Sequence, residues 1–136
     1  HPLAGSARYR VLLADDHAMV RQGIRALLER QETLVIIAEA PDGVRAVELA
    51  DALIPDVVVI DANMPHMDGI EATRRIKARH PDTVVIGVSV QSATQVAESM
   101  LSAGASAYLT KESAGDQLYE AIVNALARGR KDVDHA

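Results

Sequence analysis

The chain has 136 residues, a length typical of one domain, and 49% of them are hydrophobic and 24% charged, which excludes a disordered chain. The absence of cysteine excludes disulfide scaffolds, thiolate metal sites and cysteine nucleophiles. A net charge of -5 and an aromatic content of 2% argue against binding of DNA, anionic membranes or stacked single-stranded nucleic acid by this chain itself.

No hydrophobic segment reaches the ~20 residues that a membrane span requires, and no signal-peptide pattern is present, so we expect a cytoplasmic protein with no membrane partner. Residues 1–8 begin without Met and are rich in small side chains, and we expect them to be a remnant of cloning outside the fold. The folded domain is expected at residues 9–129, and a short tail at residues 130–136.

Short segments rich in β-branched residues alternate along the chain with segments of helical periodicity. The expected strands are residues 9–14, 34–38, 57–60, 84–88 and 107–110. Hydrophobic residues at helical spacing follow each of them, as Val20, Ile24 and Leu27 do in the first interval. This alternation predicts an α/β fold in which right-handed crossovers place helices on both faces of a parallel sheet.

Several turns and helix faces can be assigned in the same way. Asp42 is expected in a turn or cap before the second helix, and Gly104 at the end of the fourth. Within the second helix, Val44, Val47 and Ala50 are expected on the buried side. Four basic residues of the third helix are expected on a solvated face: Arg74, Arg75, Lys77 and Arg79.

The third expected strand is hydrophobic at every position and leads directly into Asp61. Such a strand is covered on both faces, and in sheets of this kind functional groups collect at the carboxyl ends of the strands. On its own, Asp61 is equally compatible with a helix cap. The residues that follow the other strands decide between these two interpretations.

Polar side chains follow most of the expected strands, at the point where each strand ends. They are Asp15, Asp16, Asp61, Ser89 and Lys111. At one edge of a sheet, three carboxylates repel one another and must share a proton or bind a hard divalent cation such as Mg²⁺. An ammonium group and a hydroxyl suit an incoming phosphoryl group, whose oxygens they stabilise. Three histidines share no spacing typical of a metal site and are expected on loops or at the surface: His17, His66 and His80.

The motifs around these residues resemble those of a known family. They are Asp15-Asp16-His17, residues 61–69 (DANMPHMDG), Val88-Ser89 and residues 104–111 (GASAYLTK). From about residue 9 to residue 128, the chain resembles a two-component response-regulator receiver domain. Residues 20–28 (VRQGIRALL) and 125–129 (ALARG) are similar to the NarL/FixJ (LuxR-type) subfamily in particular.

The resemblance implies a flavodoxin-like (CheY-like), doubly wound sheet of five parallel strands in the order 2-1-3-4-5. It also implies that Asp61 accepts a phosphoryl group from a phosphohistidine of a sensor histidine kinase and forms an aspartyl phosphate. In the family pattern, Mg²⁺, which Mn²⁺ can replace, is held by Asp15, Asp16, Asp61 and the backbone carbonyl of Asn63.

A conformational switch is implied as well. Lys111 is expected to pair with the phosphoryl oxygens, Ser89 to turn inward as a hydrogen-bond donor, and the ring of Tyr108 to follow. The face formed by the fourth helix, fifth strand and fifth helix then changes shape. The implied output is transcription regulation through a C-terminal DNA-binding domain absent from this chain, with homodimerisation on phosphorylation.

Two positions depart from the commonest family pattern. Glu112 follows Lys111 where many receivers have Pro, so we expect no cis bond there, since it would cost about 2.5–4 kcal/mol. Val90 follows Ser89 where a smaller Ala or Gly is frequent, and its larger side chain is expected to narrow the access to Asp61.

The residues also leave two alternatives open. One is a small Mg²⁺-dependent phosphohydrolase with an aspartyl-phosphate intermediate at Asp61, although Asn63 stands where such enzymes usually have a second Asp. The other is an interaction module that works without phosphorylation, which the presence of Ser89 and Lys111 beside the carboxylates disfavours. We therefore expect a phosphoacceptor and not an enzyme.

Overall fold

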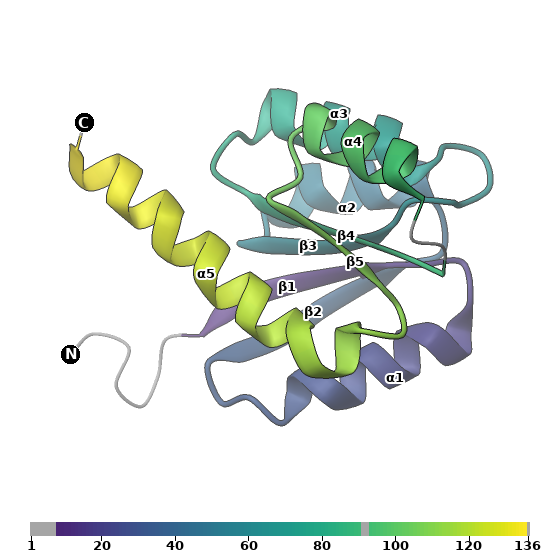
Figure 1. The fold of residues 1–136 in the computed structure, drawn as a ribbon, viewed down its shortest axis with the longest axis horizontal. Helices are drawn as coiled ribbons and strands as arrows, with labels where there is room; N and C mark the ends of the chain where they lie inside the picture. The colour runs from purple at the N-terminus through teal and green to yellow at the C-terminus, as the bar shows by residue number, and fades with distance from the viewer. Residues whose placement is uncertain (1–7, 91–92, 136) are drawn as a thin grey trace.

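The computed structural model describes residues 8–90 and 93–135, which form a parallel five-stranded sheet with helices on both faces (Figure 1). The strands are β1 (Tyr9–Ala14), β2 (Leu34–Ala40), β3 (Val57–Asp61), β4 (Val84–Ser89) and β5 (Ala107–Thr110). The helices are α1 (Ala18–Glu29), α2 (Gly43–Leu53), α3 (Gly69–Arg79), α4 (Thr94–Ala103) and α5 (Ala114–His135). The strand order is β2-β1-β3-β4-β5, so the predicted fold is confirmed.

Helices α1 and α5 cover one face of the sheet, and α2, α3 and α4 cover the other (Figure 1). The first core packs Leu28 of α1 and Ile122 of α5 against the strands, and the second packs Ile76 of α3 and Met100 of α4. Every residue of β3 is buried, because both faces of the central strand are covered. Each large side chain that is fully buried contributes roughly 1.5–3 kcal/mol, so the two aliphatic cores hold the sheet edge in place.

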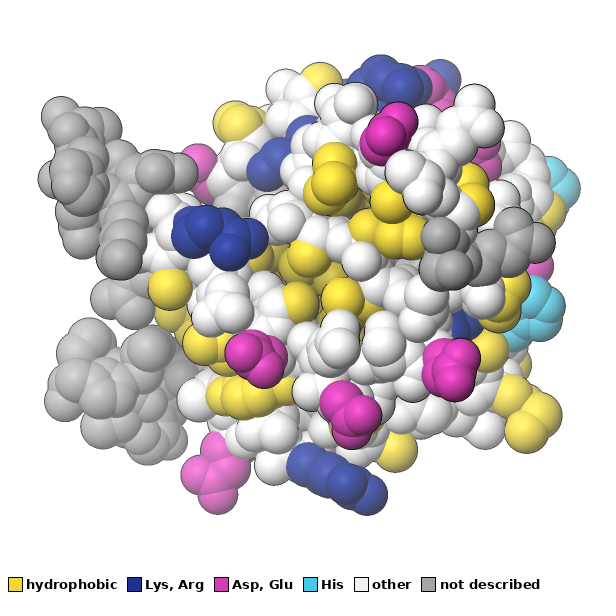
Figure 2. All heavy atoms as spheres, in the orientation of Figure 1, with side chains coloured by type: hydrophobic (Ala, Val, Ile, Leu, Met, Phe, Trp, Pro, Cys, Tyr) yellow, Lys and Arg dark blue, Asp and Glu magenta, His cyan; other side chains and the backbone are white. Residues whose placement is uncertain are grey.

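The edge strand β5 is covered less completely than the centre of the sheet. All four of its residues are half-buried, whereas β3 and β4 are buried throughout. Figure 2 shows the side of the molecule where α4, β5 and α5 meet. Hydrophobic side chains gather over these three elements, and acidic side chains lie along α5. Leu101 of α4 and Val123 of α5 are among the large hydrophobic residues that remain exposed.

Local capping interactions set the ends of the helices. Asp42 caps α2 by accepting a hydrogen bond from the backbone N of Arg45 (2.8 Å), and Asp68 caps α3 in the same way, from the backbone N of Glu71 (2.9 Å). Gly104 ends α4 with φ of 118°, a left-handed conformation that favours glycine. The predicted roles of Asp42 and Gly104 are therefore confirmed.

Two predicted helix faces need correction. Val44 is 41% exposed, and Ala46 takes the buried position on α2 instead, because the first turn presses its glycine against the β3–α3 loop. Lys77 is not on a solvated face: its ammonium donates to the backbone O of Pro81 (2.7 Å) and of Thr83 (2.8 Å). Its long methylene stem allows this burial, and burial lowers the pKa of Lys77.

The last helix is longer than predicted. It continues to His135 through most of the predicted tail, since one interior glycine, Gly129, costs a helix only about 1 kcal/mol and no proline follows. The predicted leader covers residues 1–8, of which residues 1–7 lie outside the described residues. None of the helices in the described part of the chain is both long and hydrophobic enough to cross a membrane.

Candidate functional site

Parallel register brings the predicted polar residues to one edge of the sheet. Ala14 of β1 pairs with Ile60 of β3, so Asp15 and Asp61, which follow these two residues, are neighbours. Asp61 in turn pairs with Val88 of β4. The carboxylates therefore meet because the strands end together, although they are 46 positions apart in the sequence.

Lys111 follows β5 and reaches both buried carboxylates. Its Nζ lies 2.8 Å from Asp15 Oδ2 and 3.2 Å from Asp61 Oδ2. The backbone N of Lys111 donates to the carbonyl O of Ser89 (2.7 Å), which ties the end of β5 to the end of β4. Since the side chains of Asp15 and Lys111 are only 2% and 13% exposed, solvent screens this pair weakly.

The two buried carboxylates retain capacity to accept a cation. Oδ1 of Asp15 accepts from the backbone N of His17 (2.8 Å), and Oδ1 of Asp61 from the backbone N of Asn63 (3.1 Å). Lys111 compensates the charge of Asp15 Oδ2, but no donor in the described part of the chain is aligned to hydrogen-bond this buried oxygen. A buried acceptor of this kind among carboxylates fits Mg²⁺, which prefers oxygen ligands.

Burial and neighbouring charges shift the protonation of this cluster. Burial raises the pKa of Asp61, the hydrogen bond from Asn63 opposes the rise, and the charge of Asp15 adds to it. Burial by itself lowers the pKa of Lys111, but the bonds and charges of Asp15 and Asp61 outweigh it, so this pKa is raised. The site thus combines a lysine, Lys111, whose protonated form is favoured with an aspartate, Asp61, whose ionised form is less favoured than usual.

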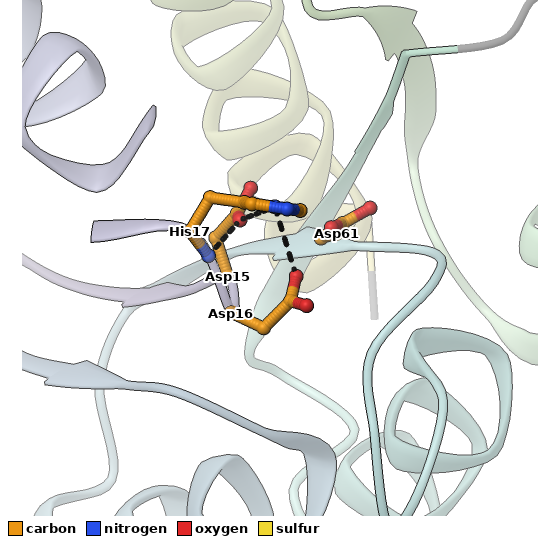
Figure 3. Close-up of side chains that lie close together, drawn as sticks. All are labelled: Asp15, Asp16, His17 and Asp61. Atoms are coloured by element: carbon orange, nitrogen blue, oxygen red, sulfur yellow. Dashed lines mark hydrogen bonds and ion pairs between the residues drawn. The ribbon is translucent and has the colours of Figure 1, made fainter. Parts of the chain in front are cut away.

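Asp16 and His17 complete the acidic cluster on the loop after β1 (Figure 3). His17 Nδ1 lies 3.1 Å from Asp16 Oδ1 and 3.4 Å from Asp15 Oδ1, and ligand atoms of these residues and Asp61 lie within 4.8 Å of one another. The predicted loop position of His17 is confirmed. Its place in the cluster was missed, because sequence spacing does not define the direction of a loop side chain.

A network of charged residues on α1 and β2, which the sequence analysis missed, supports the loop after β1. The guanidinium of Arg21 donates to the backbone O of Asp15 and, through Nε, to Glu39 Oε1 (2.9 Å). Arg25 Nε donates to the other oxygen of Glu39 (2.8 Å). Burial alone raises the pKa of Glu39, but the bonds from Arg25 and Arg21 outweigh it, so the pKa is lowered. The i, i+4 spacing of the two arginines on α1 was the available signal.

The remaining predicted residues surround this cluster without joining it as ion pairs. Ser89 is buried at the end of β4, beside Thr110 of β5. Tyr108 is half-buried in β5 and packs against the second core, opposite Gly87. Asn63 is exposed on the β3–α3 loop. The structure thus joins the three aspartates with the lysine, and it places Ser89 and Tyr108 on the neighbouring strands.

Close backbone contacts fix the β3–α3 loop, which follows Asp61. A Cβ added to Gly69 would overlap the carbonyl O of Asp61, and one added to Gly43 would overlap the carbonyl O of Met67. Both overlaps involve backbone atoms, which cannot turn aside as a flexible side chain can. Glycine at these two positions therefore lets the loop approach β3 and α2 closely.

Comparison with known families identifies the class of protein to which this fold belongs. The family model described as response regulator receiver domain matches residues 11–123. The chain belongs to this family. It is the receiver domain of a two-component response regulator, a class of phosphoacceptor signalling proteins, so the predicted family is confirmed. The phosphohydrolase alternative is not favoured.

Curated relatives of this receiver domain are transcriptional regulators of the LuxR/NarL type. The transcriptional regulatory protein DegU of Brevibacillus brevis is 37% identical over 115 residues, which are 85% of this chain and 49% of DegU. The nitrate/nitrite response regulator protein NarP of Escherichia coli is 36% identical over 90% of this chain and 57% of its own length. The chain thus spans about half the length of these relatives.

A solved structure agrees with this subfamily. The two-component response regulator of the LuxR family from Aurantimonas sp. SI85-9A1 is 37% identical and superposes with a TM-score of 0.84. The match covers 89% of this chain and 86% of the other. The predicted NarL/FixJ (LuxR-type) resemblance is therefore confirmed by these relatives.

Proposed function

We propose that Asp61 is the phosphoacceptor of this receiver domain and takes a phosphoryl group from the phosphohistidine of a sensor histidine kinase. The observation that supports this most directly is the position of Asp61 at the end of a fully buried strand, 3.2 Å from Lys111 Nζ and beside Asp15. Asp15 is also buried and contacts the same lysine, but it follows a strand that is not buried at every residue, whereas Asp61 is the last residue of one that is.

The reaction is an in-line displacement at phosphorus. A carboxylate oxygen of Asp61 forms the new O–P bond as the P–N bond to the kinase histidine breaks, and the imidazole leaves with the bonding electrons and takes up a proton. Lys111 is close enough to the nucleophile to hold the equatorial oxygens, and Ser89, on the adjacent strand end, is the proposed hydroxyl donor.

The proposed cation is Mg²⁺, which Mn²⁺ can replace, held by Asp15, Asp16, Asp61 and the backbone carbonyl of Asn63. The donor set supports this assignment, because it is made of oxygens and includes the buried Asp15 Oδ2 without an aligned hydrogen bond. When bound, the ion neutralises carboxylate repulsion and the charge that develops on the phosphoryl group.

The proposed switch starts from the strand ends on the other side of Asp61. Ser89 would move toward the phosphoryl group and Tyr108 would follow, which changes the face made by α4, β5 and α5. The incomplete cover of β5 supports this assignment, since half-buried residues have fewer neighbours to hold them in one position.

The proposed output is control of transcription by a DNA-binding domain outside this chain, with residues 9–129 as the receiver domain. We propose homodimerisation on phosphorylation and a cytoplasmic location with no membrane partner. The LuxR/NarL relatives, which are about twice as long as the match, support the output domain. The net charge of -5 supports the expectation that this chain does not bind DNA alone.

The function is tested by treating the chain with Mg²⁺ and a small acyl phosphate and then measuring the intact mass. We expect the addition of one phosphoryl group with Mg²⁺ or Mn²⁺ and none in excess chelator. Full labelling in the chelator would refute the metal-assisted mechanism. Continuous phosphate release from many unrelated phosphoesters would instead show a phosphohydrolase.

A further inference from the structure

The imidazole of His17 lies against the carboxylates of the proposed cation site (Figure 3). Its Nδ1 lies 3.1 Å from Asp16 Oδ1 and 3.4 Å from Asp15 Oδ1. The side chain is 66% exposed, so a solvated ion can reach it without rearrangement of the core. The receiver mechanism proposed above assigns no role to this ring.

The backbone of His17 is fixed independently of its ring. Its N donates to Asp15 Oδ1 (2.8 Å), and its carbonyl O accepts from the backbone N of Arg21 (3.0 Å). His17 stands at the N-cap of α1, yet its side chain makes no capping hydrogen bond. The loop backbone therefore holds the ring beside the acids, and the ring takes no part in capping the helix.

The spacing of the polar atoms matches the coordination shell of a metal ion. Around an octahedral ion with bonds of about 2.1 Å, adjacent ligands are about 3.0 Å apart and opposite ligands about 4.2 Å apart. The two distances from His17 Nδ1 are close to the adjacent spacing, and the whole group lies within 4.8 Å. The buried side chain of Asp15 belongs to the same group, and Lys111 Nζ lies 2.8 Å from its Oδ2.

We propose that His17 contributes a nitrogen ligand to this site and makes it prefer Co²⁺ or Zn²⁺ over Mg²⁺. Imidazole suits first-row transition ions, whereas Mg²⁺ favours oxygen ligands and keeps its waters. The inference rests on the proposed function in that Asp15, Asp16 and Asp61 hold the same ion. It goes further, because it makes His17 the residue that determines metal selectivity in this receiver.

A purely structural role for the ring makes a different prediction. If His17 only hydrogen-bonds Asp16, its removal would alter the affinity for every divalent ion by a similar factor. If it is a ligand, removal would weaken transition ions selectively. The ratio of two affinities in one protein therefore separates the two roles, and it does not depend on phosphorylation.

The test is a titration of the wild-type chain and the His17→Ala variant with Co²⁺, followed by visible absorption, and with Mg²⁺ by calorimetry. We expect the variant to lose about tenfold or more in Co²⁺ affinity and less than about twofold in Mg²⁺ affinity. Excess Mg²⁺ should displace Co²⁺ in the wild type, which shows that the ions share one site. With Zn²⁺ and ¹⁵N-labelled histidine, the Nδ1 resonance of His17 should shift.

His66→Ala is the matched control, since His66 is exposed on the β3–α3 loop and is not part of the acidic cluster. It should leave the ratio of the two affinities unchanged. His17→Gln keeps a polar side chain on the loop but removes the imidazole. It should lower the ratio of Co²⁺ affinity to Mg²⁺ affinity as His17→Ala does. If both His17 variants kept the wild-type ratio of Co²⁺ to Mg²⁺ affinity, the proposal would be overturned. If these variants still showed Mg²⁺-dependent labelling of Asp61, the receiver function would stand independently of that result. Loss of Mg²⁺ competition would refute the shared site itself.

Discussion

The loop that carries Asp15 and the strand end that carries Lys111 lie on opposite sides of Asp61, and they are built differently. On the acidic side, the backbone N of Asp15 donates to the backbone O of Ala40 (3.0 Å), its backbone O accepts from Arg21, and Glu39 holds that arginine. These contacts join β1, β2 and α1, so a shift of Asp15 would require all three elements to move.

The strand end beyond Asp61 has mostly local support. Thr110 and Ser113 bond to each other within one turn, with distances of 3.0–3.1 Å, and β5 is half-buried throughout. Val90, directly after Ser89, is 72% exposed, so its side chain points to solvent. The difference teaches that the acids stand on a side of the site that three elements fix, whereas Lys111 follows a strand with mostly local support, which is the mobile side in the proposed switch.

The largest effect is expected from Asp61→Asn, which disables both sides at once. An amide is not a nucleophile, so labelling by an acyl phosphate should fall to background, as measured by intact mass. The fold should persist, because the change is isosteric and preserves the hydrogen bond from Asn63. Equal labelling of the variant would mean that another residue is the acceptor.

Lys111→Ala should disable only the mobile side. Asp61 should still be labelled, although more slowly without the ammonium group that holds the equatorial oxygens, and Mg²⁺ should still bind, since the lysine is neither nucleophile nor metal ligand. Chemical-shift changes on phosphorylation, near Tyr108 and along α5, should be lost. Changes as large as those of the wild type would remove the sensing role from Lys111.

Asp16→Ala should disable only the fixed side. Removal of one of three carboxylates should weaken Mg²⁺ binding by about tenfold or more, measured by calorimetry. Glu32→Ala is the matched control, because Glu32 is exposed and makes no ion pair with the described residues. Asp51 is less suitable as a control, because its carboxylate pairs with His80 (2.8 Å) and Arg79, and its removal would break these two contacts as well. An equal loss in both variants would point to a general charge effect.

The smallest effect is expected from Glu39→Gln, which weakens the network below the acids. The pKa of Glu39 is lowered on folding, so its stabilisation is present above the ordinary glutamate pKa and is lost as pH falls through the folded value. The variant should lose about 1 kcal/mol of unfolding free energy at pH 7, and this difference should vanish in acid. A difference that persists in acid would indicate altered packing instead.

The fold and the meeting of Asp15, Asp61 and Lys111 could be predicted from sequence, because strands of one parallel sheet end at a common edge. The network of Arg21 and Glu39 could not, because it joins a helix to a strand whose register is set only by tertiary pairing. The same limit applies to single side chains. Val44 and Lys77 fit a helical period, but a close backbone contact at Gly43 leaves Val44 exposed, and a long flexible stem lets the ammonium of Lys77 fold back to the backbone O of Thr83.

The contact between Gly43 and Met67 bears on how mutational surveys of this domain should be interpreted. Gly43 carries no functional group and is not part of the acidic cluster, yet any side chain there would strike the backbone of the loop that follows Asp61. In a saturation library selected for signalling, this position should tolerate no replacement, and a ranking by intolerance would group it with the phosphoacceptor. Separate scoring of abundance and signalling would distinguish a residue that shapes the loop from one that performs the chemistry.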